Sequence, residues 1–256
     1  MAMEPLTLIA NPGSASRKYA LYAGQTVRAQ LHFEYLDYHI VCTIHKDGTY
    51  EHAPVELKDF NEAAVKLPDL LHKHKLLSNK EHISRVGLRI VAPSSFFLGD
   101  HLIDDEVVAR LEALEPHAPL HISATLHELR SLRKVFDGLP IVGVSDSAFH
   151  ITKPDYAWNY GLPLEDADRL EIKRFGYHGI SVASVVRTLQ GTEKLPPKVI
   201  ICHLGSGASI TAVHGGKSMD TTMGYSPLEG VVMSTRSGTI DFTAVRALKE
   251  AFNYND

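Results

Sequence analysis

The chain repeats one local pattern, in which an apolar strand runs into a turn rich in glycine and serine and then reverses. In its first occurrence an apolar run and the turn NPGS occupy residues 6–14, and a returning run follows at residues 19–22. In the second, a run and the turn LGSG occupy residues 198–207, and residues 208–214 return. Such turns expose backbone N–H groups, and small side chains let a phosphate approach them. Two of them would hold one polyphosphate from two sides, although either alone is as often an ordinary hairpin turn.

The remaining hydrophobic spacing predicts an α/β chain. Strands are expected at residues 27–33, 38–45, 86–91, 140–144 and 217–222, and the strands of the first third of the chain are expected to form an antiparallel meander. Helices are expected at residues 61–77, 107–114, 120–135 and 181–189. Pro68 is a candidate break in the first helix, and residues 156–173 show no clear period. We divide the chain into domains 1–150 and 151–256.

The composition argues against several functional classes. Lys and Arg number 26 against 30 Asp and Glu, so the chain lacks the basic excess of a nucleic-acid-binding protein. Two cysteines, Cys42 and Cys202, are too few for a disulfide scaffold or a Cys-rich zinc site. No apolar run has the length of a membrane span, and residues 1–5 lack the pattern of a signal peptide. We therefore expect a soluble cytoplasmic protein with neither nucleic-acid nor membrane partners.

Five segments, taken together, resemble the acetate/butyrate kinase family, within the superfamily that also contains sugar kinases and actin. They are NPGSASRKY at 11–19, SDSAFH at 145–150, RFGYHGIS at 174–181, HLGSGASI at 203–210, and DTTMGYSPLEG at 220–230, which leads to MSTRSGTID at 233–241. Their order and spacing match the family over nearly the whole chain.

The resemblance implies an α/β fold with an actin-like (ribonuclease H-like) lobe of mixed sheet and helices, plus an incomplete second lobe. It also implies a phosphotransferase that moves a phosphoryl group between ATP and acetate, or a similar short carboxylate, to give an acyl phosphate. Mg²⁺ is the implied cofactor, bound with ATP or ADP. Family members continue well past residue 241, so we expect this chain alone to be weakly active or inactive. We also expect it to form a homodimer or to associate with the missing C-terminal part.

The resemblance assigns roles to individual residues. The residues that match the family's catalytic groups are Asp146, His178 and Arg236. Arg89 matches the arginine that binds the substrate carboxylate, and the pocket around the acetate methyl corresponds to Val91, Leu120, Tyr177 and Pro227. Asn11 matches the Mg²⁺-linked asparagine and Lys18 the lysine on the nucleotide phosphates. The second phosphate loop corresponds to His203, Leu204, Gly205, Ser206 and Gly207.

Four of these residues also have an ordinary explanation. Most arginines are solvated, so Arg89 and Arg236 taken alone would be surface residues. His178 is one of 15 histidines, and Asp146 is suited to cap a helix over residues 147–150. A carboxylate substrate is already ionised near neutral pH, so we assign Asp146 to ordering Mg²⁺-bound water or orienting an arginine, rather than to proton abstraction.

Two alternatives remain open at this stage. The histidines at positions 72, 74, 117 and 121 could in principle face a zinc ion, but no third ligand has convincing spacing. The chain could also be a non-catalytic or split protein of this type, which binds a carboxylate or phosphate and needs another segment for activity. It departs from the family pattern in having Ala92-Pro93-Ser94 where His-Gly-Gly is usual.

Overall fold

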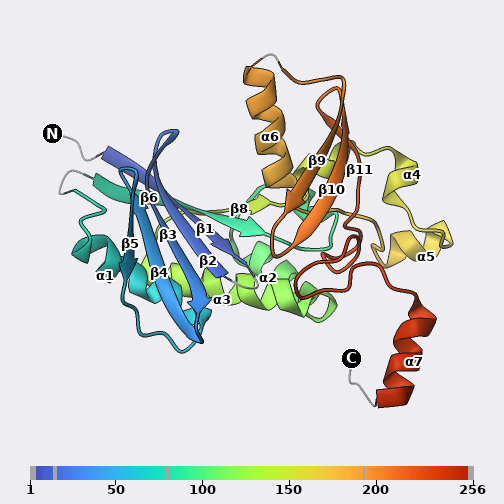
Figure 1. Cartoon of the computed structure of the whole chain (residues 1–256), viewed down its shortest axis with the longest axis horizontal. Helices are drawn as coiled ribbons and strands as arrows, with labels where there is room; N and C mark the ends of the chain where they lie inside the picture. The colour runs from blue at the N-terminus through green and yellow to red at the C-terminus, as the bar shows by residue number, and fades with distance from the viewer. Residues whose placement is uncertain (1–3, 14–15, 79–80, 193, 253–256) are drawn as a thin grey trace. The chain divides into compact units, whose positions relative to one another are not determined.

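The computed structural model describes residues 4–13, 16–78, 81–192 and 194–252 (Figure 1). These residues divide into two compact units. Unit 1 comprises the described residues up to Ala92 together with Gly99–Ser145, and unit 2 comprises Pro93–Leu98 together with the described residues from Asp146 onward. The main division therefore lies five residues before the one drawn from the sequence, and residues 93–98 belong with unit 2.

Unit 1 is built on a large mixed sheet. Its strands are β1 Glu4–Pro12, β2 Ser16–Ala23, β3 Thr26–Leu36, β4 His39–Lys46, β5 Thr49–Ala53, β6 Glu81–Ile90, β7 His101–Leu102 and β8 Ile141–Ser145. Over the described residues their order is β5-β4-β3-β2-β1-β6-β8-β7. Strands β1 to β5 form the antiparallel meander that the sequence predicts, while β6 and β8 extend it in parallel.

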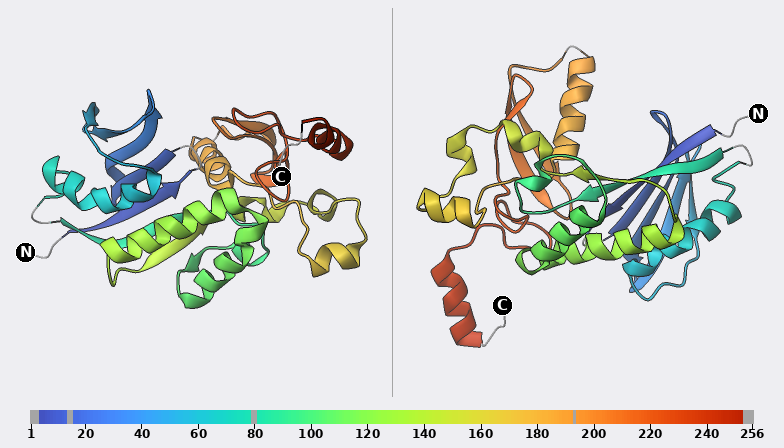
Figure 2. Two further views of the ribbon diagram at one scale, coloured as in Figure 1. Left: turned by 90° about the horizontal axis from the view of Figure 1, so that it is seen from below. Right: turned by 180° about the vertical axis from the view of Figure 1, so that it is seen from behind.

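Alternation along the strands gives the large sheet one buried and one open face. In β2, Arg17, Tyr19 and Leu21 are buried, whereas Lys18 between them is exposed. Helices cover the buried face, with α3 (Pro119–Val135) against β1 and β6, and α1 (Ala63–Lys73) and α2 (Asp105–Leu114) against α3. Figure 2 shows α1 and α3 on the same side of the sheet. Each leucine side chain fully buried between these layers contributes about 1.5–3 kcal/mol to stability.

The proposed break at Pro68 is wrong. Pro68 lies inside α1, which continues to Lys73. The helix keeps its turn because Leu67, Leu70 and Leu71 pack into the core on one side while the proline ring is exposed. Burial of this apolar stripe offsets the hydrogen bond that proline cannot donate.

Unit 2 repeats the strand–turn–strand pattern in a small sheet. Its strands are β9 Lys198–Leu204, β10 Ala208–His214 and β11 Lys217–Thr221, ordered β11-β10-β9 over the described residues. Helix α6 (Gly179–Gly191) covers one face of this sheet (Figure 1). The core between them is formed by Val182, Val186, Ile201 and Val213.

The other elements of unit 2 are short or exposed. They are the 3₁₀ helices η2 (Phe96–Leu98) and η4 (Ala148–Thr152), and the α-helices α4 (Asp155–Trp158), α5 (Leu164–Arg169) and α7 (Phe242–Phe252). Helices α4 and α5 are not predicted from the sequence, because helices of four and six residues are too short to establish a hydrophobic period. Within the part of the chain that the structure describes, no helix has both the length and the apolar character needed to cross a membrane.

Candidate functional site

In unit 1, three candidate residues lie on the adjacent strands β6, β1 and β2. Nη1 of Arg89 donates to Oδ1 of Asn11 over 3.2 Å. Lys18 is the direct cross-strand partner of Asn11, so their side chains share a face of the sheet. Arg89 thus contacts the amide of Asn11, and Lys18 places a second cation on the same face of the sheet. This composition suits the oxygens of a phosphate or carboxylate.

The two apolar candidates of unit 1, Val91 and Leu120, lie outside these strands. Val91 comes directly after β6 and is buried. Leu120 lies in the first turn of α3, but its side chain is outside the described residues. Its predicted contact with a substrate methyl therefore stays a prediction.

In unit 2, Asp146 holds the start of α6. Its Oδ2 accepts the backbone N–H of His178 over 2.7 Å, and its main-chain oxygen accepts the N–H of Gly179 over 2.7 Å. A Cβ at Gly179 would lie 2.5 Å from that main-chain oxygen, so this approach requires glycine. The cap of η4 is instead Ser147. The ordinary explanation of Asp146, a cap for residues 147–150, is therefore wrong.

His178 occupies a left-handed backbone conformation, with φ of 61°, immediately before α6. Nδ1 of its ring lies 3.0 Å from Oγ of Ser209. The ring stacks on His203, with 4.1 Å between centroids, and Nδ1 of His203 lies 2.9 Å from Oγ of Ser181. Two serines and a ring contact thus fix the orientation of both imidazoles.

Gly207 marks where His178 and Arg236 approach each other. A Cβ placed on Gly207 would lie 2.8 Å from Nη2 of Arg236 and 3.3 Å from Nε2 of His178. The guanidinium is held from its other side, because Nη1 donates to the carbonyl of Pro227 over 2.8 Å. The absence of a side chain at position 207 therefore leaves room beside both groups.

The turn between β9 and β10 is tied to the segment that carries Arg236. Oγ of Ser234 donates to the carbonyl of Ser206 over 2.8 Å, and the backbone N–H of Ser234 donates to the same carbonyl over 3.3 Å. Within the turn, the N–H of Gly205 donates to the carbonyl of Gly207 over 3.1 Å. Ser206 and Leu204 are exposed. The turn is thus anchored at one side and open to solvent.

Tyr177 and Pro227 are buried, and Tyr177 is anchored at both ends. Its hydroxyl donates to the carbonyl of Tyr225 over 2.6 Å, and its own carbonyl lies 2.9 Å from Nε2 of His150. Nδ1 of His150 lies 2.9 Å from Oγ of Ser218. Burial lowers the pKa of His150 to about 4, so this histidine is neutral near pH 7.

Sequence reasoning missed the groups that hold these side chains, namely His150, Ser181, Ser209 and Ser234. One of them had a usable signal. Ser209 is the cross-strand partner of His203. Pairing the two strands on either side of the LGSG turn would have placed Ser209 beside His203. The others contact residues more than 20 positions away, at distances that only the folded chain sets.

The described residues contain no group of three or more His, Cys, Asp or Glu side chains that could hold a metal ion. The side chain of His117 lies outside them. A cation bound near Asn11 would therefore take most of its ligands from water and phosphate oxygens. That is the usual coordination of Mg²⁺, so the donors present fit this ion.

Comparison with known proteins identifies relatives of this chain. The model of the Acetokinase family matches residues 6–255. An acetate kinase of Thermoanaerobacter pseudethanolicus is 42% identical over 76% of this chain and 50% of its own length. An acetate kinase of Caldanaerobacter subterraneus is 37% identical over 95% of this chain and 63% of its own length.

Solved structures agree with this match. A propionate kinase from Francisella tularensis has a TM-score of 0.84 and 31% identity, covering 100% of this chain and 66% of its own. Porphyromonas gingivalis acetate kinase has a TM-score of 0.78 and 31% identity, covering 98% of this chain and 65% of its own. The α/β fold class predicted from the sequence is confirmed. The chain spans about half to two thirds of the length of these relatives.

Proposed function

Because the chain belongs to the Acetokinase family, we propose that it carries out phosphoryl transfer between ATP and a short carboxylate such as acetate. Family membership confirms the resemblance drawn from the five sequence segments. The observation that most supports the proposed chemistry is the approach of His178 and Arg236 to Gly207, beside an open turn of small residues. A cation, an imidazole and exposed backbone in one place suit a phosphoryl group with developing charge.

The proposed reaction displaces ADP from the terminal phosphorus of ATP. A carboxylate oxygen forms a bond to that phosphorus as the bond to the bridging oxygen breaks, and the electron pair leaves on ADP. Both reactants are anions. The protein must therefore hold them in line and neutralise charge, and needs no covalent intermediate of its own.

Arg236 and His178 would contact the transferring group. The guanidinium of Arg236 stays ionised at any working pH and offers paired donors to phosphate oxygens. Ser209 and the ring of His203 hold the imidazole of His178, so Nε2 is the atom that would bind a phosphoryl oxygen. Asp146 would act by fixing the backbone of His178.

We propose Arg89 as the residue that binds the substrate carboxylate. As the family resemblance assigns them, Val91, Leu120, Tyr177 and Pro227 are proposed contacts of the substrate methyl group. The relatives include enzymes named for acetate and for propionate. We propose a carboxylate of this size, because one added methylene changes binding by only about 1–3 kcal/mol in an apolar pocket.

The two Gly/Ser turns would bind the phosphate chain. Lys18 and the backbone of residues 203–207 would each contact nucleotide phosphates. Asn11 would be a protein ligand of Mg²⁺ or of its water. When bound, Mg²⁺ neutralises charge on the phosphates.

Localisation and assembly complete the proposal. We propose that the protein works in the cytoplasm, where its nucleotide substrate is found, and that it acts as a homodimer or together with the segment that its longer relatives carry. Gel filtration coupled to light scattering measures the assembly directly.

A single-turnover assay tests the proposed reaction. The protein, supplied with the segment that its longer relatives carry and in excess over Mg·ATP, is mixed with carbon-labelled acetate and hydroxylamine, which converts acetyl phosphate to labelled acetohydroxamate and releases phosphate. We expect labelled hydroxamate whose formation depends on ATP and is lost in Arg236→Ala. Arg246→Ala is the control, because Arg246 makes an exposed 3.9 Å ion pair with Glu250 on α7. Binding of both substrates without any transfer would contradict the proposal.

A further inference from the structure

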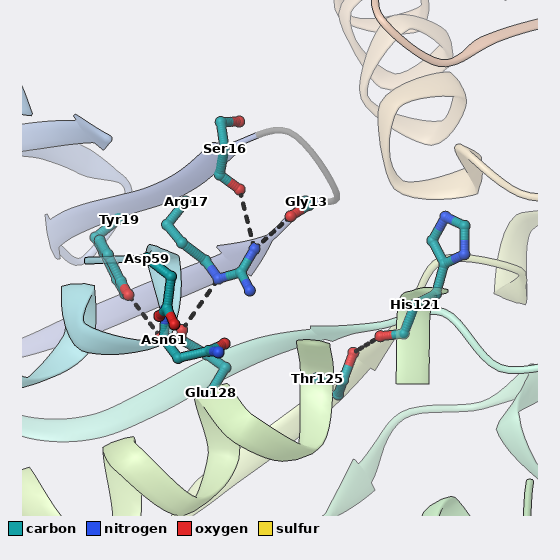
Figure 3. Close-up of polar contacts among 9 residues, drawn as sticks. All are labelled: Gly13, Ser16, Arg17, Tyr19, Asp59, Asn61, His121, Thr125 and Glu128. Carbon is teal, nitrogen blue, oxygen red and sulfur yellow. Dashed lines mark hydrogen bonds and ion pairs between the residues drawn. The ribbon is translucent and has the colours of Figure 1, made fainter. Parts of the chain in front are cut away.

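A buried ionic cluster lies entirely within unit 1, next to Gly13 and Ser16 (Figure 3). The hydroxyl of Tyr19 donates to Oε1 of Glu128 over 2.7 Å, and Nε of Arg17 lies 3.5 Å from Oε2 of the same carboxylate. Arg17 is 4% exposed and Glu128 is 1% exposed. Among the described residues, neither Nε of Arg17 nor Oε2 of Glu128 has a hydrogen-bond partner.

These two charges occupy core positions. Arg17 alternates with Tyr19 and Leu21 on the buried face of β2, and Glu128 lies on the face of α3 that also buries Leu129 and Leu132. Removing a charge from water is costly, and a pair of apolar residues at such positions is often at least as stable. The stability of the core therefore does not explain why an ion pair is present here.

The hydrogen bonds made by the other end of the Arg17 guanidinium explain the ion pair. Its Nη1 donates to the carbonyl of Gly13 and, over 3.3 Å, to the carbonyl of Ser16. The N–H of Gly13 donates to the carbonyls of Ser16 and Asn11, over 3.0 Å and 3.1 Å. From the buried face of the sheet, Arg17 thus donates hydrogen bonds to the carbonyls of both Gly13 and Ser16. A carbonyl held toward a buried cation is kept away from an anion bound on the open side.

We propose that Glu128 is a positioning residue that acts through Arg17, holding Gly13 and Ser16 in the conformation that binds phosphate. The inference rests on the proposed function, because it takes this turn as a phosphate-binding element. The carboxylate of Glu128 aligns the guanidinium of Arg17, and the hydroxyl of Tyr19 holds that carboxylate in place. Loss of either charge leaves the carbonyls of Gly13 and Ser16 free to turn.

Four variants separate this role from a purely structural one. Arg17→Met and Glu128→Gln each break the ion pair, and the double variant Arg17→Met/Glu128→Leu removes both buried charges together. Arg130→Met is the matched control on α3, because it breaks an exposed 2.8 Å pair with Glu112. The comparison is made at pH 8, because burial raises the pKa of Glu128 to about 7 and the carboxylate is ionised above that value.

Three quantities are measured on the whole chain: the urea unfolding midpoint, the amide exchange rate of a peptide covering residues 11–18, and the affinity for Mg·ATP by calorimetry. We expect both single variants to lower the midpoint, to speed exchange about tenfold and to weaken Mg·ATP binding about tenfold, as for a lost charge-assisted hydrogen bond. The double variant should recover the midpoint but neither the exchange rate nor the affinity. Arg130→Met should match the wild type throughout.

Recovery of all three quantities in the double variant would overturn the proposal, because the pair would then serve stability alone. Unchanged exchange in the single variants would overturn it equally. If the wild type binds no Mg·ATP even when supplied with the segment that its longer relatives carry, the proposed function fails, while the exchange rates still decide whether Glu128 positions Gly13 and Ser16.

Discussion

The backbone N–H of His178 donates to the carboxylate of Asp146 over 2.7 Å, although 32 residues separate them in the chain. The main-chain oxygen of Asp146 accepts the next N–H, that of Gly179. One buried aspartate therefore fixes both the left-handed backbone of His178 and the first residue of α6. The position of the imidazole depends on this contact.

Asp146→Asn and Asp146→Ala should differ sharply in activity. If Asp146 accepts a backbone hydrogen bond and transfers no proton, the amide oxygen of asparagine replaces it. We expect Asp146→Asn to lower single-turnover transfer less than about tenfold and Asp146→Ala to lower it about 10²-fold. Equal losses in the two variants would instead indicate a proton-transfer role.

Gly179→Ala should destabilise unit 2. The new Cβ would meet the main-chain oxygen of Asp146 at 2.5 Å, and a backbone atom cannot rotate away. We expect a loss of about 2–3 kcal/mol in the free energy of unfolding. Gly191→Ala, at the other end of α6, is the control, because a Cβ there has no neighbour within 4 Å among the described residues. It should leave stability unchanged or raise it by about 0.5 kcal/mol. Urea unfolding followed by the fluorescence of Trp158, the sole tryptophan of the chain, reports on unit 2.

His150 should make the stability of unit 2 depend on pH. Burial lowers its pKa from 6.5 to about 4, so between these values the unfolded chain binds a proton that the folded chain does not. The free energy of unfolding therefore falls as the pH drops from about 6.5 to about 4, by an amount on the order of 3 kcal/mol. His150→Asn should flatten this part of the profile when Trp158 fluorescence is followed at a series of pH values. A wild-type profile parallel to that of the variant would count against the assignment.

The sequence predicted the elements whose patterns are local. The meander of unit 1, the hairpin of unit 2 and helices α2, α3 and α6 follow from periodicity and turn residues that span only a few positions. Pro68 was misjudged because its helix is stabilised by packing of Leu67, Leu70 and Leu71, which the local sequence does not reveal.

The candidate site was predicted from family motifs, and the residues that support it were not. His178 and Arg236 both lie close to Gly207, whose lack of a side chain the motif alone does not explain. The buried Arg17–Glu128 pair spans 111 positions and joins a strand to a helix. Such long-range contacts arise from tertiary packing, which hydrophobic spacing cannot specify.

Arg89 and Arg236 should show different kinetic effects in a form of the protein that turns over. Arg89, held by Asn11 at 3.2 Å, is proposed to bind the ground-state carboxylate, so Arg89→Ala should mainly raise the KM for acetate. Arg236, held by Pro227 beside Gly207, is proposed to meet charge that develops as the phosphoryl group moves. Its loss should lower kcat and kcat/KM together, because a contact made only in the transition state does not affect substrate binding. Steady-state assays at varied acetate concentration separate the two patterns, with Arg246→Ala as the control for loss of an exposed arginine. If Arg89→Ala and Arg236→Ala change KM and kcat in the same proportions, the proposed division of roles between the two arginines is wrong.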